Sequence, residues 1–582
     1  MKKKRFISIR MLGVCLLVFA LVAPWISSAQ EGDDSDYLDD AIGCTAGGIG
    51  KEATADGSVL SFQSADCGSC DPRLLYVPPA YHKKWERRIL RIVPQMSGGG
   101  PIEDVIEDSP YSIPEVPYTY GYFKGVFGHM NDHQLGISES TRGANRALNN
   151  SNGIFCVTEL SMIAMERCET ARDAIKLMGK LAEQYGFHGF STGEMLFVAD
   201  TEEVWIWEIY RPGPLWAPDP ATGMDPTGRL GCAWVAQRVP DDEICVMPNL
   251  PRIAEIDLND PDNFMASANI FSLADELGLH QPGEPYDMRR IYGSNMRASV
   301  RLWNLYRMLA PSQYGSMPYS NDLADYPFSF KPDEKLTVLD VAELFRNEAE
   351  GTEYDNTAGA AAGPYGNPQH YGATRLAATP ASEYIDITQS RSWLPDPIGG
   401  ILWWGNHTLN TSVVIPFYVG INELPKSQTI GDHWEFTRDS AFWAFNFVNS
   451  WAQLCWMGMY PDIRNLMNNL EAEIVNTLPA IEEKAYRIYQ QETGYKCKET
   501  GYRYMRGKSH KHKCEKSEKK EYKKASEYLT SFCIDNADYV LSSWWDLADY
   551  LISNFDQGRY PRNNADGVRI RPSQEWQDAV FP

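Results

Sequence analysis

The stretch from Cys44 to Asp66 reads CTAGGIGKEATADGSVLSFQSAD and contains two short apolar runs. Asp56-Gly57 separates the runs, and an Asp-Gly pair between strand-like segments is a strong signal for a β-hairpin. Cys44 stands at the start of the first expected strand, after the small residue Gly43. If the Gly43–Cys44 bond is cleaved, the new α-amine can act as the base for its own thiol, because an α-amine titrates near neutrality. The stretch therefore suits a cysteine nucleophile at a new amino terminus.

Length and charge exclude several classes of protein. The chain has 582 residues, 43% of them hydrophobic, which is enough apolar material for a large core. It carries 54 Lys and Arg against 77 Asp and Glu, a formal net charge of −23. A surface of this charge repels phosphate backbones, so we expect no nucleic-acid partner.

The first 29 residues have the pattern of a cleaved export signal. The basic residues Lys2 to Arg5 precede an apolar run from Met11 to Trp25, and the small residues at 27–29 suit signal peptidase. The run is too short for a stable transmembrane anchor, and no other stretch reaches eighteen apolar residues. We expect a secreted or periplasmic protein without stable membrane insertion, in which the acidic residues 30–43 form a propeptide.

The cysteine count suits an oxidising compartment. There are twelve cysteines, and loss of Cys15 with the signal leaves eleven, an odd number that suggests one thiol kept free. With Cys44 as that thiol, the rest could form up to five disulfides of unknown pairing. These ten are Cys67, Cys70, Cys156, Cys168, Cys232, Cys245, Cys455, Cys497, Cys514 and Cys533.

Cys67-Gly-Ser-Cys70 looks like the signature of papain-like proteases, in which the second cysteine is catalytic. Asp71 follows where that signature has Trp or Tyr, and no histidine lies between His188 and His280, where the partner histidine is expected. We expect a local disulfide, or two separately paired cysteines, instead.

Helical and strand-like patterns are mixed along the chain without βαβ regularity, which favours an α+β fold. Strand-like runs at 195–199 and 204–209 form an expected hairpin, which strands at 232–239 and 244–247 continue. The other expected strands are 59–62 and 74–77. A helical hairpin is expected near 158–185, with a capping box from Thr170 to Asp173 at the start of its second helix. The other expected helices are 296–309, 338–348, 437–458, 462–490 and 515–555.

We expect a main domain at 44–460 and a helical C-terminal region at 461–582. Residues 496–524 carry twelve Lys and Arg against four Glu and are interpreted as a solvated loop and helix start. The run His510-Lys-His512-Lys-Cys514 inside it lacks a fourth ligand at a standard zinc spacing. We therefore expect no metal.

Several blocks of the sequence resemble the cysteine N-terminal-nucleophile dipeptidases, the family of lactic-acid bacterial dipeptidase A and the secernins. The blocks span roughly 44–490 and are the Cys-Thr start, 53–58 (ATADGS), 64–66 (SAD), 120–141, 159–175, 234–253, 360–366 (AAAGPYG), 399–405 (GGILWWG) and 439–443. The resemblance implies the αββα sandwich of N-terminal-nucleophile hydrolases, with a helical C-terminal extension.

The resemblance also implies roles for single residues. Cys44 is the expected nucleophile and, through its freed amine, the base. Asp66 matches the acid that anchors the amine or thiol in related cysteine acylases, and Asn249 matches an oxyanion or substrate-amide contact. Asn131 opens a block after the third strand and is expected to assist.

An arginine of the acylases has two candidate matches, Arg297 and Arg301, and the spacing does not decide between them. Arg301 is the one included in the expected site. Gln63 departs from the acylases, which carry an arginine near this point. Their arginine network therefore does not transfer directly to this chain.

The implied activity is hydrolysis of dipeptides or small peptides by an exported cysteine dipeptidase without a metal or organic cofactor. Two alternatives remain open at this stage. One is an amidase that acts on N-acyl amides, and the other is a catalytically inactive surface-binding protein of the same fold. The sequence leaves the oligomeric state open, a homo-oligomer included.

Overall fold

The computed structural model describes residues 43–189, 191–294, 296–370, 373–494, 522–556, 558, 560–561 and 569–581. The expected signal peptide and residues 30–42 of the expected propeptide lie outside these residues. So does most of the Lys-rich segment, with Cys497, Cys514 and the histidines at 510 and 512.

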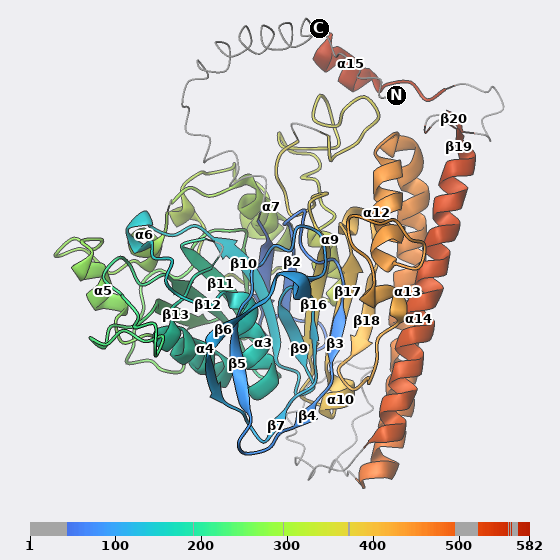
Figure 1. The fold of residues 1–582 in the computed structure, drawn as a ribbon. Coiled ribbons are helices and arrows are strands. Elements are labelled where there is room, and N and C mark those ends of the chain that lie inside the picture. The colour runs from blue at the N-terminus through green and yellow to red at the C-terminus, as the bar shows by residue number, and fades with distance from the viewer. Residues whose placement is uncertain are drawn as a thin grey trace, which may run out of the picture. The chain divides into compact units, whose positions relative to one another are not determined.

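Two large antiparallel sheets form the centre of the described chain (Figure 1). In spatial order, the six-stranded sheet consists of β14 (Ile244–Met247), β1 (Thr45–Ile49), β2 (Val59–Ser64), β16 (Tyr384–Ser390), β17 (Ile401–Asn406) and β18 (Val414–Tyr418). The eight-stranded sheet consists of β15 (Phe264–Ala266), β13 (Ala233–Arg238), β12 (Val204–Tyr210), β11 (Gly193–Ala199), β10 (Gly136–Arg142), β9 (Gly128–Asn131), β8 (Tyr122–Lys124) and β3 (Leu75–Val77).

The hairpin expected around Asp56-Gly57 is confirmed. Strands β1 and β2 pair antiparallel from Thr45 opposite Ser64 to Ile49 opposite Leu60. The two sheets face each other, and Ser138 Oγ on β10 donates to Ser61 Oγ on β2 at 3.0 Å.

Gly48 lets β1 approach the opposite sheet closely. A Cβ atom at this position would lie 2.6 Å from Val204 and 2.8 Å from Phe197, both on the eight-stranded sheet. The glycines between Cys44 and the turn are therefore part of the packing between the sheets.

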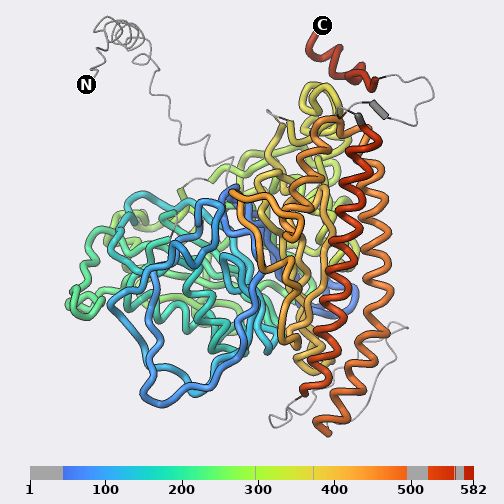
Figure 2. Tube along the Cα trace, turned by 45° about the vertical axis from the view of Figure 1, so that its right-hand side comes forward, coloured from blue at the N-terminus to red at the C-terminus, as the bar shows by residue number. Residues whose placement is uncertain are grey.

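Helices cover the outer faces of both sheets (Figures 1 and 2). Helices α3 (Val157–Arg167) and α4 (Ala171–Tyr185) contact the eight-stranded sheet, and the Thr170 side chain caps α4 by accepting from the Asp173 amide. Helix α12 (Ala441–Ala452) contacts β17, and α14 (Lys523–Asn554) contacts β18 and lies beside α13 (Trp456–Thr493). The expected α+β class is confirmed, and the boundary expected at residue 460 falls inside α13.

The remaining elements are short. The helices are α5 (Ile270–Glu276), α6 (Met288–Tyr292), α7 (Val300–Leu309), α8 (Pro311–Tyr314), α9 (Val338–Leu344), α10 (Asp396–Gly399), α11 (Lys426–Thr429) and α15 (Gln574–Val580). The 3₁₀ helices are η2 (Ile102–Val105), η3 (Arg146–Leu148), η4 (Leu323–Asp325) and η5 (Leu409–Thr411). Two-stranded sheets are formed by β4 (Ala80–Tyr81) with β7 (Tyr118–Thr119), by β5 (Arg87–Ile92) with β6 (Glu107–Pro114), and by β19 (Phe555–Asp556) with β20 (Tyr560–Pro561).

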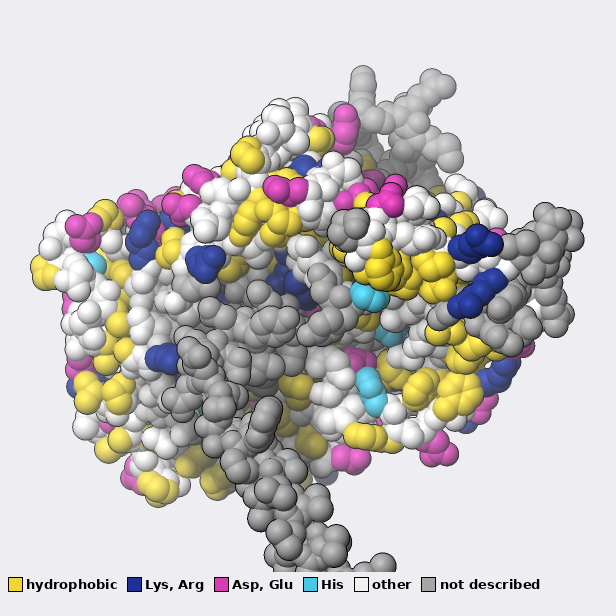
Figure 3. Space-filling model, turned by 90° about the horizontal axis from the view of Figure 1, so that it is seen from above, with side chains coloured by type: hydrophobic (Ala, Val, Ile, Leu, Met, Phe, Trp, Pro, Cys, Tyr) yellow, Lys and Arg dark blue, Asp and Glu magenta, His cyan; other side chains and the backbone are white. Residues whose placement is uncertain are grey.

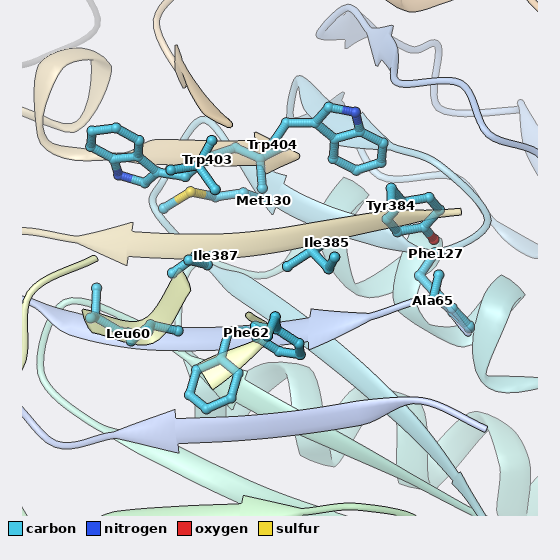
Figure 4. Packing of buried hydrophobic residues seen from close by; sticks show 14 of the residues in the cluster. Leu60, Phe62, Ala65, Phe127, Met130, Tyr384, Ile385, Ile387, Trp403 and Trp404 are labelled. Atoms are coloured by element: carbon cyan, nitrogen blue, oxygen red, sulfur yellow. The ribbon is translucent and has the colours of Figure 1, made fainter. Parts of the chain in front are cut away.

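Apolar side chains pack on both sides of the six-stranded sheet (Figure 4). On the outer side, Phe62 of β2 packs edge-on against Phe345 after α9, with ring centroids 5.9 Å apart. On the inner side, Tyr384 of β16 stacks on Trp404 of β17 at 4.3 Å, and both rings contact His129 of β9. Because successive strand residues alternate between faces, the polar residues of β2 at positions 61 and 63 point to the opposite sheet.

The sequence-based expectation for residues 244–247 is wrong. Strand β14 does not continue the hairpin of β11 and β12 but pairs with β1 in the other sheet, with Met247 opposite Ala46. The turn at 240–243 carries the chain across, since Gly50 N–H donates to Glu243 O and Glu52 N–H to Asp241 O. This crossing brings the residues after β14 to the start of β1.

The described residues contain more free thiols than the single one that the odd cysteine count suggests. Cys67 and Cys70 form a local disulfide, as anticipated. In the described part of the chain, however, the following cysteines are buried free thiols: Cys44, Cys156, Cys168, Cys232, Cys245 and Cys533. They come from different elements of the core, where each behaves as a small apolar side chain.

One face of the molecule is shown in Figure 3. Among the described side chains on that face, acidic and basic groups are interspersed with hydrophobic ones. None of the helices in the described part of the chain is both long and apolar enough to span a bilayer.

Candidate active site

Cys44 lies immediately before β1 and is held by its neighbours on both sheets. Its side chain is buried, with 6% of the residue exposed. Ser140 Oγ of β10 donates to the Cys44 carbonyl oxygen at 3.0 Å, and the Thr45 amide donates to Ser64 Oγ of β2 at 3.0 Å. The residue most favoured by the sequence therefore lies at the junction of the two sheets.

Two arginines point at the peptide bond that precedes Cys44. The Gly43 carbonyl oxygen accepts from Arg375 Nη2 at 2.7 Å and from Arg301 Nη1 at 3.2 Å. Arg301 Nη1 also donates to the Cys44 carbonyl oxygen at 3.2 Å and to Thr45 Oγ1 at 3.0 Å. Charged donors on a carbonyl oxygen stabilise negative charge that develops there.

The geometry distinguishes the two arginine candidates. Arg301 lies in the first turn of α7, and its guanidinium reaches Gly43, Cys44 and Asn249. The backbone of Arg297 forms an isolated antiparallel bridge with Asp322. Arg301 is the candidate whose guanidinium contacts the residues around Cys44.

Asp66 lies two residues after the end of β2 and is completely buried. Its carboxylate accepts from Arg375 Nη2 at 2.6 Å, from Ser64 Oγ at 2.8 Å and from Ser382 Oγ at 2.5 Å. Its carbonyl oxygen accepts from the Gly43 amide at 3.1 Å. Asp66 thus orients Arg375 and holds the backbone next to Cys44.

Asn249 lies against the Gly43–Cys44 bond. A Cβ atom at Gly43 would come within 2.6 Å of the Asn249 amide, so the two residues are in direct contact. Asn249 Oδ1 accepts from Arg301 Nη2 at 2.6 Å, while Nδ2 donates to the Thr141 carbonyl at 2.6 Å. Because its N–H group is used inside the protein here, its role as an oxyanion donor stays a prediction.

Asn131 is not brought to this site. Its Nδ2 donates to the carbonyls of Met165 at 3.0 Å and Cys168 at 2.8 Å, at the C-terminal end of α3. Asn131 lies beside the start of β10 at Gly136, and Ser140 is roughly 13 Å farther along that strand at the usual rise per residue. The observed contacts of Asn131 hold the end of α3.

Sequence reasoning missed Arg375, Ser382 and two acids, Glu139 on β10 and Glu194 on β11. Arg375 belongs to the irregular segment before β16, where no motif marks it. The acylases carry an arginine near the position of Gln63. In this chain Arg375 places its guanidinium beside Asp66 instead. Gln63 Oε1 instead accepts from the Glu139 amide and joins the two sheets. The one available signal for Glu139 was an acid inside a strand-like run.

The acids change the chemistry of the thiol. Burial, and then the negative charges of Glu139 and Asp66, raise the pKa of the Cys44 thiol well above its ordinary value. Burial raises the pKa of Glu139 to about 7. In the unprocessed chain the thiol is therefore protonated at neutral pH. Within the described residues, no group of three or more His, Cys, Asp or Glu side chains is arranged to hold a metal ion.

Comparison with known proteins gives a family. Residues 43–469 match the model of peptidase family C69, which is well over half of the chain. The chain belongs to peptidase family C69. The resemblance found in the sequence is thereby confirmed, and the C69 fold is N-terminal-nucleophile-like.

The alignments of this chain with relatives in family C69 cover most of each relative's length. A protein named "Probable dipeptidase" from Latilactobacillus sakei is 26% identical over 424 residues, covering 66% of this chain and 78% of the relative. "Dipeptidase A" from Lactobacillus helveticus is 25% identical over 419 residues, covering 69% and 80%. A "Probable dipeptidase" from Salmonella dublin is 23% identical over 410 residues, covering 65% and 82%.

Proposed function

We propose that this C69 protein is made as an exported precursor and that self-cleavage of the Gly43–Cys44 bond unmasks Cys44 as its nucleophile. Membership of the family, together with relatives named as dipeptidases, makes the chain a cysteine-type dipeptidase. The proposal concerns the identity of the nucleophile, the processing of the precursor and the export of the protein.

The observation that carries the proposal is the pair of guanidinium groups on the Gly43 carbonyl oxygen. Addition of the Cys44 thiol to that carbonyl places negative charge on the oxygen, where Arg301 and Arg375 already donate. The acyl group then moves from nitrogen to sulfur, and water releases the preceding segment with a Gly43 carboxylate. Cys44 is left with a free amine and a free thiol. The family match also begins at residue 43.

The mature site follows from the same contacts. An α-ammonium group at Cys44 lowers the pKa of the neighbouring thiol, which offsets the effect of burial and of the two acids. The thiolate attacks the substrate carbonyl, the α-amine passes its proton to the leaving amine, and water hydrolyses the thioester. Arg301 and Asn249 remain beside the oxygen on which charge develops. No metal or organic cofactor enters these steps.

The layered arrangement and the amino terminus support the rest of the proposal. Two facing sheets with helices on their outer sides agree with the four-layer αββα sandwich of N-terminal-nucleophile hydrolases. Basic residues followed by the apolar run of 11–25 support export.

The first prediction concerns Cys44. We expect Cys44→Ala to abolish both processing and dipeptide hydrolysis, because it removes the attacking group of both reactions. Cys44→Ser should process slowly and hydrolyse poorly, since an alcohol is a weaker nucleophile at neutral pH. Amino-terminal sequencing and intact mass of the exported protein, with a dipeptide hydrolysis assay, measure these effects. A fully active protein that still carries residues 30–43 would refute the maturation step.

A further inference from the structure

Two buried glutamates lie side by side on the eight-stranded sheet, and one of them, Glu139, is next to Cys44. Glu194 of β11 is paired with Thr141 of β10, and Glu139 is two residues before Thr141 on the same strand. Residues two apart on a strand share a face, so Glu139, Thr141 and Glu194 point the same way. Both glutamates are 0% exposed. They form one acidic pair inside the protein.

The pair lacks the basic partner that buried carboxylates usually have. Glu139 Oε1 accepts from Thr141 Oγ1 at 2.9 Å, but Glu139 Oε2 and both oxygens of Glu194 have no hydrogen bond of good geometry in the described part of the structure. Among the described residues, no Lys or Arg forms an ion pair with either acid. Arg211, which interacts with Glu194 at longer range, directs its terminal nitrogens to Asn149 Oδ1 and the Gly189 carbonyl.

An unpaired acidic pair of this kind is costly in a protein interior. Burial and the charge of Glu139 raise the pKa of Glu194 well above its ordinary value, so the pair keeps a proton at neutral pH. A cation bound between the two carboxyl groups would remove that cost. The place therefore suits a positively charged ligand.

The position of the pair relative to Cys44 identifies that ligand. Ser140, the residue after Glu139 on β10, donates to the Cys44 carbonyl oxygen at 3.0 Å, so this part of β10 lies against Cys44. The Glu139 carboxyl group and the Cys44 thiol share a side-chain hydrogen bond. The α-nitrogen of a dipeptide is two bonds from the carbonyl carbon that the thiol attacks. With the sulfur about 3–3.5 Å from that carbon before attack, the α-nitrogen also arrives within roughly 5 Å of the sulfur.

We propose that Glu139 and Glu194 bind the α-ammonium group of the substrate, so that the site selects peptides with a free amino terminus over N-acyl amides. The proposal rests on Cys44 being the nucleophile. The ammonium group donates to the open oxygens of the pair and replaces the missing base. The same contact places the substrate carbonyl against the sulfur.

The test compares a dipeptide with an analogue of the same shape that lacks the amine. The substrates are Ala-Ala and propionyl-Ala, and the measured quantity is the ratio of their kcat/KM values. We expect the wild type to prefer Ala-Ala strongly. Glu194→Gln and Glu139→Gln should each lower that preference by about 10- to 100-fold, the usual range for one charge-assisted hydrogen bond. Most of the change in this ratio should come from a lower kcat/KM for Ala-Ala.

Glu159→Gln is the matched control. Glu159 is also a buried acid whose pKa is raised to about 7, but it pairs with Arg88 at 2.9 Å on the α3 side of the molecule. It should leave the preference unchanged. Thermal denaturation reports whether each variant folds, and either glutamate variant alone is sufficient for the comparison.

The outcomes are distinguishable from those for Cys44. An unchanged preference in a folded glutamate variant, or a wild type that cleaves both substrates equally, overturns the role of the pair and leaves Cys44 standing. Hydrolysis by the Cys44→Ala protein would instead overturn the nucleophile and, with it, this inference.

Discussion

At the scale of single residues, Arg375 makes two contacts in the site, although no sequence pattern indicated it. It is 332 positions away from Gly43 in the chain, yet the same Nη2 atom donates to the Gly43 carbonyl and to Asp66. We expect Arg375→Gln to slow both processing and hydrolysis by ~10²–10³-fold, the usual loss for one oxyanion donor. Intact mass over time measures processing, and kcat on a dipeptide measures hydrolysis.

Arg229→Gln is the control for this prediction, because Arg229 forms an exposed ion pair with Glu276 at 2.7 Å. It should process and hydrolyse at close to the wild-type rate. If Arg375→Gln behaves like Arg229→Gln, the guanidinium at Gly43 has no part in the reaction.

At the scale of elements, β1 determines where Cys44 lies, and its glycines determine how closely the sheets approach. A methyl group at Gly48 would overlap Val204 and Phe197 on the opposite sheet. We expect Gly48→Ala to lower the free energy of unfolding by about 1–3 kcal/mol, the usual cost of overpacking. It should also lower kcat, since Cys44 immediately precedes the same strand. Denaturant unfolding and dipeptide kinetics measure the two effects.

Gly100→Ala provides the comparison, because its new methyl group would meet Trp434 at 3.6 Å and the Ser97 carbonyl oxygen at 4.0 Å, which are ordinary contact distances. It should change stability little. Equal stability of the two alanine variants would show that the sheets adjust to the extra methyl group at Gly48.

At the scale of the whole molecule, the described structure depends on its packed core more than on disulfides. Buried thiols are present in both core clusters, and one local disulfide joins Cys67 to Cys70. In denatured, unreduced protein we expect alkylation at Cys44, Cys156, Cys168, Cys232, Cys245 and Cys533 and none at Cys67 or Cys70. Peptide mass mapping after alkylation measures this pattern. A single labelled thiol, as the odd cysteine count suggested, would instead mean that the buried cysteines pair.

Local patterns were sufficient for much of the fold. The Asp56-Gly57 turn, the alternation in β11 and β12 and the Thr170 cap of α4 depend on neighbours a few residues away, so they are visible in the sequence. The pairing of β14 with β1 was not, because a short strand carries no mark of the sheet that it joins.

The sequence by itself determined the α+β class, the hairpin that begins at Cys44, and the family, because motifs and periodicity are properties of local segments. Only the tertiary structure decided that Arg301 reaches Gly43, that Arg375 and Ser382 hold Asp66, and that Glu139 and Glu194 lie together. It also decided which cysteines pair, because a disulfide needs two Cα atoms within about 7 Å. These contacts join segments far apart in the chain, and only packing of the two sheets brings them into reach.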